Sequence, residues 1–199
     1  MPLCHDKKIC HIHIPKTGGT SVINYFRMPK NLDSMFGMDG NSERSHFSQL
    51  EIQEICDISD YFKFVFIRNP WDRLASEFAW RMAARPNKHG ILNDFNEFNE
   101  FVSGLEAIFD DIVNKKYPHR ICNHFFPQNW FFYSVDFVGR YETFREDLEK
   151  LGKMFNIDRL IPHDNKAKTV DYRILYNENS IEIVKKLYHD DIKLFGYDF

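Results

Sequence analysis

The stretch HIHIPKTGGTSVINYF at residues 11–26 joins two patterns with different periods across a glycine pair. Alternation of side chains predicts a β-strand over residues 8–14, and Pro15 ends its pairing. From residue 19 to residue 27 the apolar spacing changes to that of a helix. A strand that runs through a tight turn into a helix is typical of an α/β domain.

The rest of the chain repeats this succession. An apolar run at residues 61–67 is typical of a strand buried on both faces, and Asn69 with Pro70 then opens a helix that reaches residue 84. The other predicted elements are a helix over residues 48–56, a strand over 136–139, a helix opened by a capping box of Thr143 and Glu146, and a last helix over 179–194. This order predicts a three-layer α/β domain with a mainly parallel central sheet flanked by helices.

Composition narrows the class of protein. With 199 residues, 43% of them hydrophobic, we expect a single domain over residues 1–199. The net charge of -3 disfavours a nucleic-acid partner, and no apolar run is long enough for an integral membrane segment. A charged segment near the start lacks the apolar core of a signal peptide, so we expect a cytoplasmic protein. The four cysteines form no CxxC pair and the nine histidines no HExxH motif, so we expect no metal site.

The loop PKTGGTS at residues 15–21 is suited to bind an anion. Glycines allow a tight turn, and the N–H groups and positive dipole end of the following helix attract negative charge. A Walker A loop places its lysine after the glycines, whereas Lys16 precedes Gly18 and Gly19. This order counts against a nucleoside triphosphate as the ligand.

PKTGGTS resembles the loop that binds the 5′-phosphosulfate of 3′-phosphoadenosine 5′-phosphosulfate (PAPS) in sulfotransferases. A second stretch, FVFIRNPWDRLASEF at residues 64–78, is similar to the 3′-phosphate site of that family, with Arg68 at the strand end and Ser76 in the next helix. FVGRYETFREDLEKL at 137–151 and YHDDIKLFGYDF at 188–199 resemble the carbohydrate branch that includes heparan sulfate 2-O-sulfotransferase. The resemblance implies a P-loop-like domain that uses PAPS as its cosubstrate.

The resemblance also implies which residues bind the donor. They are Pro15, Lys16, Thr17, Gly18, Gly19, Thr20, Ser21, Arg68, Ser76 and, in a late loop, Lys166. Lys16 has a catalytic part as well, because its charge and the loop N–H groups would stabilise the leaving bisphosphate. A sulfuryl group carries less charge than a phosphoryl group, so no divalent ion is demanded.

A hydroxyl acceptor also needs a base, and histidine has the side-chain pKa nearest neutrality. His46 stands just before the helix whose Ser48 and Glu51 form a capping box, and it matches the histidine base of the resembled family. His124, in HFFPQ, resembles a segment near the acceptor in related sulfotransferases and is the second candidate. Which of the two is the base stays open. His11 and His13 alternate on a strand and are expected to face neighbouring structure.

The predicted function is sulfuryl transfer from PAPS to a hydroxyl group, of a carbohydrate or glycolipid, by in-line displacement with a histidine base. Two alternatives remain: a non-catalytic nucleotide-binding protein with the same fold, and a P-loop small-molecule kinase. Trp71 and Trp80 could stack on a sugar, although aromatic residues on helices more often belong to the core. Related eukaryotic enzymes are anchored in the Golgi, so a trimmed Golgi-type chain is the alternative to a cytoplasmic protein.

Overall fold

The computed structural model describes residues 3–28, 46–84, 91–92, 94–117, 122–161 and 171–199. The chain divides into two compact units, each built from two separate stretches of sequence. The first, which we call the sheet unit, comprises Met1–Arg68 and Gln128–Ala167. The second, the helical unit, comprises Asn69–Pro127 and Lys168–Phe199.

The sheet unit contains four strands in the order β1-β2-β3-β4. They are β1 (Leu3–Cys4), β2 (Ile9–His11), β3 (Phe62–Ile67) and β4 (Phe137–Arg140). Strand β2 pairs with β3 in parallel and β3 with β4 in parallel, whereas the short β1 is antiparallel to β2. The mainly parallel sheet predicted from the sequence is therefore confirmed, with β1 as an addition that the sequence did not reveal.

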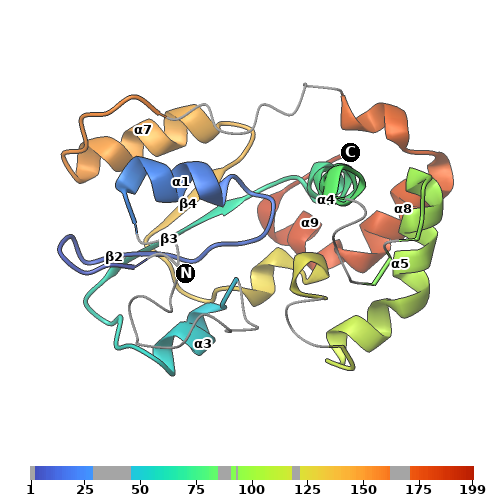
Figure 1. The fold of residues 1–199 in the computed structure, drawn as a ribbon, viewed down its shortest axis with the longest axis horizontal. Helices are drawn as coiled ribbons and strands as arrows, with labels where there is room; N and C mark the ends of the chain where they lie inside the picture. The colour runs from blue at the N-terminus through green and yellow to red at the C-terminus, as the bar shows by residue number, and fades with distance from the viewer. Residues whose placement is uncertain (1–2, 29–45, 85–90, 93, 118–121, 162–170) are drawn as a thin grey trace. The chain divides into compact units, whose positions relative to one another are not determined.

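Helices flank both faces of this sheet. In Figure 1, α1 (Gly19–Phe26) and α7 (Phe144–Met154) cover one face of the strands, and α3 (Gln49–Gln53) lies on the other. The buried residues between the strands and helices α1 and α7 include Ile9, Val22, Tyr25, Phe26, Phe64, Phe66, Leu148 and Leu151. Three layers are thus present within the sheet unit, and the apolar core packs α1 and α7 against the strands.

One predicted helix start is wrong in its details. Thr143 does precede α7, but its side chain makes no cap hydrogen bond to the helix backbone. Its hydroxyl instead donates to the Asp147 carboxylate at 2.8 Å, which also accepts from the N–H of Arg140 at 3.0 Å. Burial raises the pKa of Asp147, but hydrogen bonds from Lys150, Arg140 and Thr143 outweigh it, so this pKa lies below its ordinary value. The carboxylate thus ties α7 to β4 in place of the capping box.

The helical unit consists of four α-helices and two short 3-10 helices among its described residues. They are α4 (Pro70–Ala84), α5 (Phe98–Val113), η1 (Asn123–Phe125), η3 (Tyr172–Leu175), α8 (Glu178–Leu187) and α9 (His189–Phe195). Asn69 caps α4 as predicted, because its Oδ1 accepts from the N–H of Trp71 at 3.0 Å. The Trp71 indole is buried and donates to the carbonyl of Ile181 at 3.1 Å, so Trp71 belongs to the core of this unit.

The single last helix predicted over residues 179–194 is wrong, because two helices meet at Tyr188. This residue leaves helical geometry with φ -114° and ψ 28°. Its ring is buried, and its hydroxyl donates to the carbonyl of Phe125 at 2.9 Å, a contact 63 residues away. This tertiary contact lies outside what the local sequence pattern reports. No helix in the described ranges is long and apolar enough to cross a membrane.

Candidate functional site

The glycine-rich loop of the sheet unit passes from β2 into α1 through two residues with left-handed backbone geometry. Lys16 has φ 68° and Gly18, the N-cap of α1, has φ 86°. A Cβ atom on Gly19 would lie 1.9 Å from Nε2 of His13, so only glycine lets the His13 ring lie against the start of the helix. One glycine is therefore needed for backbone conformation and the other for a close approach.

The start of α1 presents backbone donors. The N–H of Ser21 donates to the carbonyl of Gly18 at 3.0 Å and so takes part in the first helical turn. Among the residues that the structure places, the N–H groups of Gly18, Gly19 and Thr20 have no hydrogen-bond acceptor. Unsatisfied N–H groups and the positive end of the helix dipole together favour a bound anion.

The hydroxyl groups of the loop differ in their surroundings. Thr17 is buried and donates to the carbonyl of Ile14 at 2.8 Å, so its proton is engaged within the loop. Thr20 is exposed, whereas Ser21 is buried. Thr17 thus stabilises the turn after Pro15, and the Thr20 hydroxyl faces solvent.

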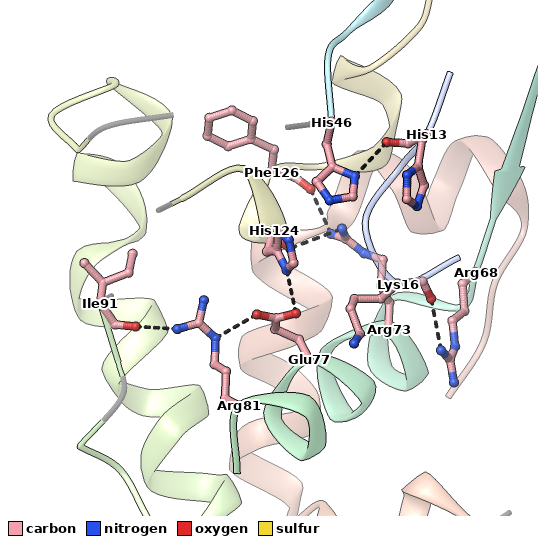
Figure 2. Close-up of polar contacts among 10 residues, drawn as sticks. All are labelled: His13, Lys16, His46, Arg68, Arg73, Glu77, Arg81, Ile91, His124 and Phe126. Atoms are coloured by element: carbon pink, nitrogen blue, oxygen red, sulfur yellow. Dashed lines mark hydrogen bonds and ion pairs between the residues drawn. The ribbon is translucent and has the colours of Figure 1, made fainter. Parts of the chain in front are cut away.

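Arg68 follows β3 and reaches back to the same loop. Its Nη1 donates to the carbonyl of Lys16 at 3.0 Å, across 52 residues of sequence (Figure 2). Its guanidinium also lies 3.9 Å above the ring of Tyr141. The buried amide of Gln128 holds the Arg68 backbone, accepting from its N–H and donating to its carbonyl, both at 2.9 Å. The structure therefore brings the two predicted phosphate-binding positions of this unit side by side.

His46 lies immediately before α3 in an unusual backbone conformation, with φ 62°. The predicted capping box is confirmed: Ser48 accepts from the N–H of Glu51, and the Glu51 carboxylate accepts from the N–H of Ser48 at 2.8 Å. His46 Nδ1 donates to the carbonyl of His13 at 3.1 Å, and the two rings are 4.4 Å apart (Figure 2). A carbonyl only accepts, so Nδ1 carries a proton and Nε2 is the basic nitrogen of the neutral ring.

His11 lies behind this pair in the core. Its ring stacks on Phe64 at 4.8 Å and on His13 at 5.4 Å. Complete burial, helped by the N-terminal charge and by His46, lowers the pKa of His11 to about 3. Neither ring nitrogen of His11 has a hydrogen-bond partner among the described residues. His11 is thus a neutral core residue that faces neighbouring structure, as expected.

Two predicted site residues belong to the helical unit. Ser76 is half-buried on α4. His124 lies in η1, and its Nδ1 is 2.7 Å from Oε2 of Glu77, a carboxylate that is 1% exposed. Lys166 lies outside the described residues. Where the structure places residues, it shows no group of three or more histidine, cysteine or acidic side chains that could hold a metal ion.

Sequence reasoning missed three side chains that support these positions. His13 faces neighbouring structure as expected, but the sequence did not show that its neighbours are Gly19 and His46. Gln128 was noted only within a motif, and nothing local showed that it holds Arg68. Glu77 has one local signal, its spacing of four residues from Arg81, which is typical of a helical ion pair.

Comparisons with known proteins show which family the chain resembles over its length. The model of the sulfotransferase family matches residues 2–198. Carbohydrate sulfotransferase 10 of Homo sapiens is 25% identical over 98% of this chain and 66% of its own length. The protein of that name from Gallus gallus is 25% identical over 98% of this chain and 65% of its own length. This chain therefore spans slightly less than two thirds of these relatives.

No solved structure matches the chain. The family match, in contrast, runs through both units and includes the glycine-rich loop, Arg68 and both candidate histidines. Because it covers nearly the whole sequence, this chain belongs to the sulfotransferase family.

Proposed function

We propose that this chain transfers a sulfuryl group from PAPS to a hydroxyl group of a carbohydrate. The observation that carries the proposal is the contact between Arg68 and Lys16 beside the start of α1. This hydrogen bond brings the Arg68 guanidinium to the main chain of the glycine-rich loop, next to the unsatisfied N–H groups at the start of α1. The names of the relatives support a carbohydrate as the acceptor.

In this proposal the donor, PAPS, is held at two anionic ends. Lys16 and the N–H groups of Gly18, Gly19 and Thr20 bind the 5′-phosphosulfate in a P-loop-like manner, because they concentrate positive charge at a helix start. Arg68 binds the 3′-phosphate. The parts of Ser76 and Lys166 in donor binding rest on the sequence resemblance alone.

The reaction is an in-line displacement at sulfur. The acceptor oxygen forms a bond to sulfur while the bond from sulfur to the 5′-phosphate oxygen breaks. The hydroxyl proton passes to Nε2 of His46, and adenosine 3′,5′-bisphosphate leaves with the electron pair of the broken bond. Lys16 stabilises the charge that grows on the leaving oxygen. His13 orients the base, since its carbonyl fixes the proton on Nδ1 of His46.

The backbone conformation of His46, as well as its ring, supports its role as the base. A left-handed conformation of a residue other than glycine costs free energy and persists where the surroundings impose it. Here the capping box of α3 and the hydrogen bond to His13 impose it. Between the two candidate bases, the proposal therefore assigns proton removal to His46.

The test combines binding with turnover. We expect adenosine 3′,5′-bisphosphate to raise the melting temperature and magnesium-ATP to leave it unchanged, because ligands stabilise the state they bind. Radiolabelled PAPS should then label at least one saccharide of a panel. Stabilisation by magnesium-ATP would indicate a kinase, and bisphosphate binding without any transfer would indicate a non-catalytic binder; either result contradicts the proposal.

A further inference from the structure

A buried carboxylate links a histidine and an arginine in the helical unit. Glu77 is 1% exposed, and its Oε1 accepts from Nε of Arg81 at 2.7 Å. Its Oε2 lies 2.7 Å from Nδ1 of His124, so the carboxylate stands between the two side chains (Figure 2). Arg81 supplies the opposite charge that a buried carboxylate needs.

The backbone that carries His124 is held from the same helix. Arg73 on α4 is 2% exposed and donates to the carbonyls of His124 at 3.3 Å and Phe126 at 2.8 Å. Tyr188 donates to the carbonyl of the residue between them. The His124 imidazole is therefore fixed both through its ring and through its main chain, which a surface histidine does not require.

The hydrogen bond from His124 decides which ring nitrogen can act on a ligand. An ionised carboxylate accepts and does not donate, so Nδ1 carries a proton and Nε2 is the accepting nitrogen of the neutral ring. The His124 side chain is 15% exposed, so it is not sealed in the core. A carboxylate behind an imidazole fixes the tautomer and the orientation of the ring.

Trp80 completes the arrangement. It lies on α4 with 37% of its surface exposed, and its ring centre is 5.3 Å from that of His124 at an angle of 31°. A partly exposed indole beside a hydrogen-bond acceptor suits a sugar ring, which has an apolar C–H face and hydroxyl groups at its edge. Neither side chain alone would distinguish a sugar from another ligand.

We propose that Glu77 is a positioning residue that holds Nε2 of His124 as the acceptor for a hydroxyl group of the carbohydrate, beside the stacking face of Trp80. The inference rests on the proposed function for the class of acceptor. It adds Glu77, to which the sequence resemblance gave no role, and it specifies how His124 would bind the acceptor.

The first experiment measures the tautomer and needs no substrate. Long-range proton–nitrogen spectra of the ¹⁵N-labelled full chain report which histidine nitrogens carry protons, and His124→Gln identifies the signals of His124. We expect Nδ1 to be protonated in the wild type and Nε2 to become protonated in Glu77→Gln, whose amide can donate to Nδ1. Glu77→Asp should restore the wild-type tautomer in part.

Two results of this experiment would overturn the inference: a wild-type ring protonated on Nε2, or a tautomer that is unchanged in Glu77→Gln. Loss of the carboxylate removes one buried counter-charge of Arg81. The double variant Glu77→Gln/Arg81→Met balances the charge and gives the same reading if the single variant fails to fold.

The second experiment tests the ligand with N-acetyllactosamine and a desulfated heparin tetrasaccharide as probes. Binding of at least one should shift the indole N–H signal of Trp80, and Trp80→Ala should weaken that binding about tenfold, as expected for loss of one aromatic contact. The control is Met82→Ala, a side chain on the same helix with 36% exposure, which should leave binding within twofold. Equal effects of the two variants, or no shift with either probe, would refute the assignment.

The two proposals fail in different ways. If the chain transfers no sulfate, the spectra and binding shifts still decide the role of Glu77 and His124. If a saccharide is sulfated while Trp80→Ala leaves its KM unchanged, the proposed function stands and this inference is wrong.

Discussion

At the scale of single residues, the proposed reaction gives different tasks to Lys16 and His46 of the sheet unit. Lys16 acts on the donor, and His46 acts on the acceptor proton. We expect His46→Asn to lower kcat by about 10²- to 10⁴-fold, the usual contribution of a general base, while bisphosphate affinity stays within about twofold. Asparagine tolerates the left-handed conformation of this position, so the backbone is preserved.

The contrasting variant is Lys16→Ala. It should weaken bisphosphate binding and also lower kcat, because the charge of the Lys16 ammonium acts on the phosphates. Calorimetric titration with the bisphosphate and initial rates with PAPS separate the two patterns. A loss of bisphosphate affinity of the same size in His46→Asn would contradict the division of tasks.

Gly19 is the residue whose substitution the structure constrains most tightly. The Cβ of Gly19→Ala would lie 1.9 Å from Nε2 of His13, so either the ring or the helix start must move. We expect a loss of about 1–3 kcal/mol in the free energy of unfolding, the usual cost of overpacking. Urea denaturation measures it.

The matched control for that prediction is the double variant His13→Ala/Gly19→Ala, which removes the ring that the new methyl group meets. In the His13→Ala background, Gly19→Ala should lower the free energy of unfolding by less than it does in the wild type. Strictly additive losses would show that the His13 ring does not lie on Gly19.

At the scale of elements, α3 matters because its start presents His46. Ser48 and Glu51 make both hydrogen bonds of the capping box. Ser48→Ala should therefore cost about 1 kcal/mol in the free energy of unfolding. Ser48→Ala should also lower kcat, because the backbone of His46 loses the support of the capping box.

The natural comparison is Thr143→Ala, at the start of α7, where the hydroxyl bonds Asp147 and makes no cap bond to the helix backbone. That variant should leave kcat unchanged, with its effect confined to stability. Equal losses of kcat in Ser48→Ala and Thr143→Ala would contradict the link between α3 and catalysis.

Helix and strand predictions from the sequence succeeded where the signal was local. The buried run that became β3, the Asn69 cap and the Ser48 capping box all depend on neighbours within a few residues. The errors have tertiary causes. The Thr143 hydroxyl bonds Asp147, which also accepts a hydrogen bond from the N–H of Arg140 on β4. The predicted last helix is interrupted at Tyr188, whose hydroxyl donates to the carbonyl of Phe125.

The candidate site follows the same division. Lys16, Arg68 and His46 could be named from motifs, and the structure brings these residues into one unit. The partner of His124 could not be named from a motif, because Glu77 lies 47 residues earlier and only folding brings its carboxylate to the ring.

At the scale of the whole molecule, His11 couples the core to pH. Its folded pKa of about 3 lies below the ordinary value of 6.5, so the unfolded chain binds the additional proton as pH falls. Stability that is present above pH 6.5 is therefore lost between pH 6.5 and pH 3. From pH 7 to pH 5 the loss amounts to about 2 kcal/mol at this position.

We expect His11→Phe, which keeps an aromatic ring against Phe64, to flatten this acid limb by a similar amount in urea denaturation at pH 7 and pH 5. His189→Gln, at an exposed position on α9, serves as the control for removal of a histidine. An equal flattening in both variants would contradict the assignment to His11.

Both units contain discontinuous stretches of the chain, and the family match runs through both of them. A single domain over residues 1–199 remains a prediction. If it is correct, denaturation of the full chain should show one cooperative unfolding transition.

In the proposed function, the glycine-rich loop and Arg68 bind the two anionic ends of one nucleotide. The most direct measurement compares the affinities of adenosine 3′,5′-bisphosphate and adenosine 5′-monophosphate for wild type and Arg68→Ala. Because Arg68 also supports Lys16, the ratio of the two affinities, and not either one alone, isolates the contact with the 3′-phosphate. We expect Arg68→Ala to lower this ratio by about 10- to 100-fold, as loss of charge-assisted hydrogen bonds does. A ratio that is the same in both proteins would contradict it.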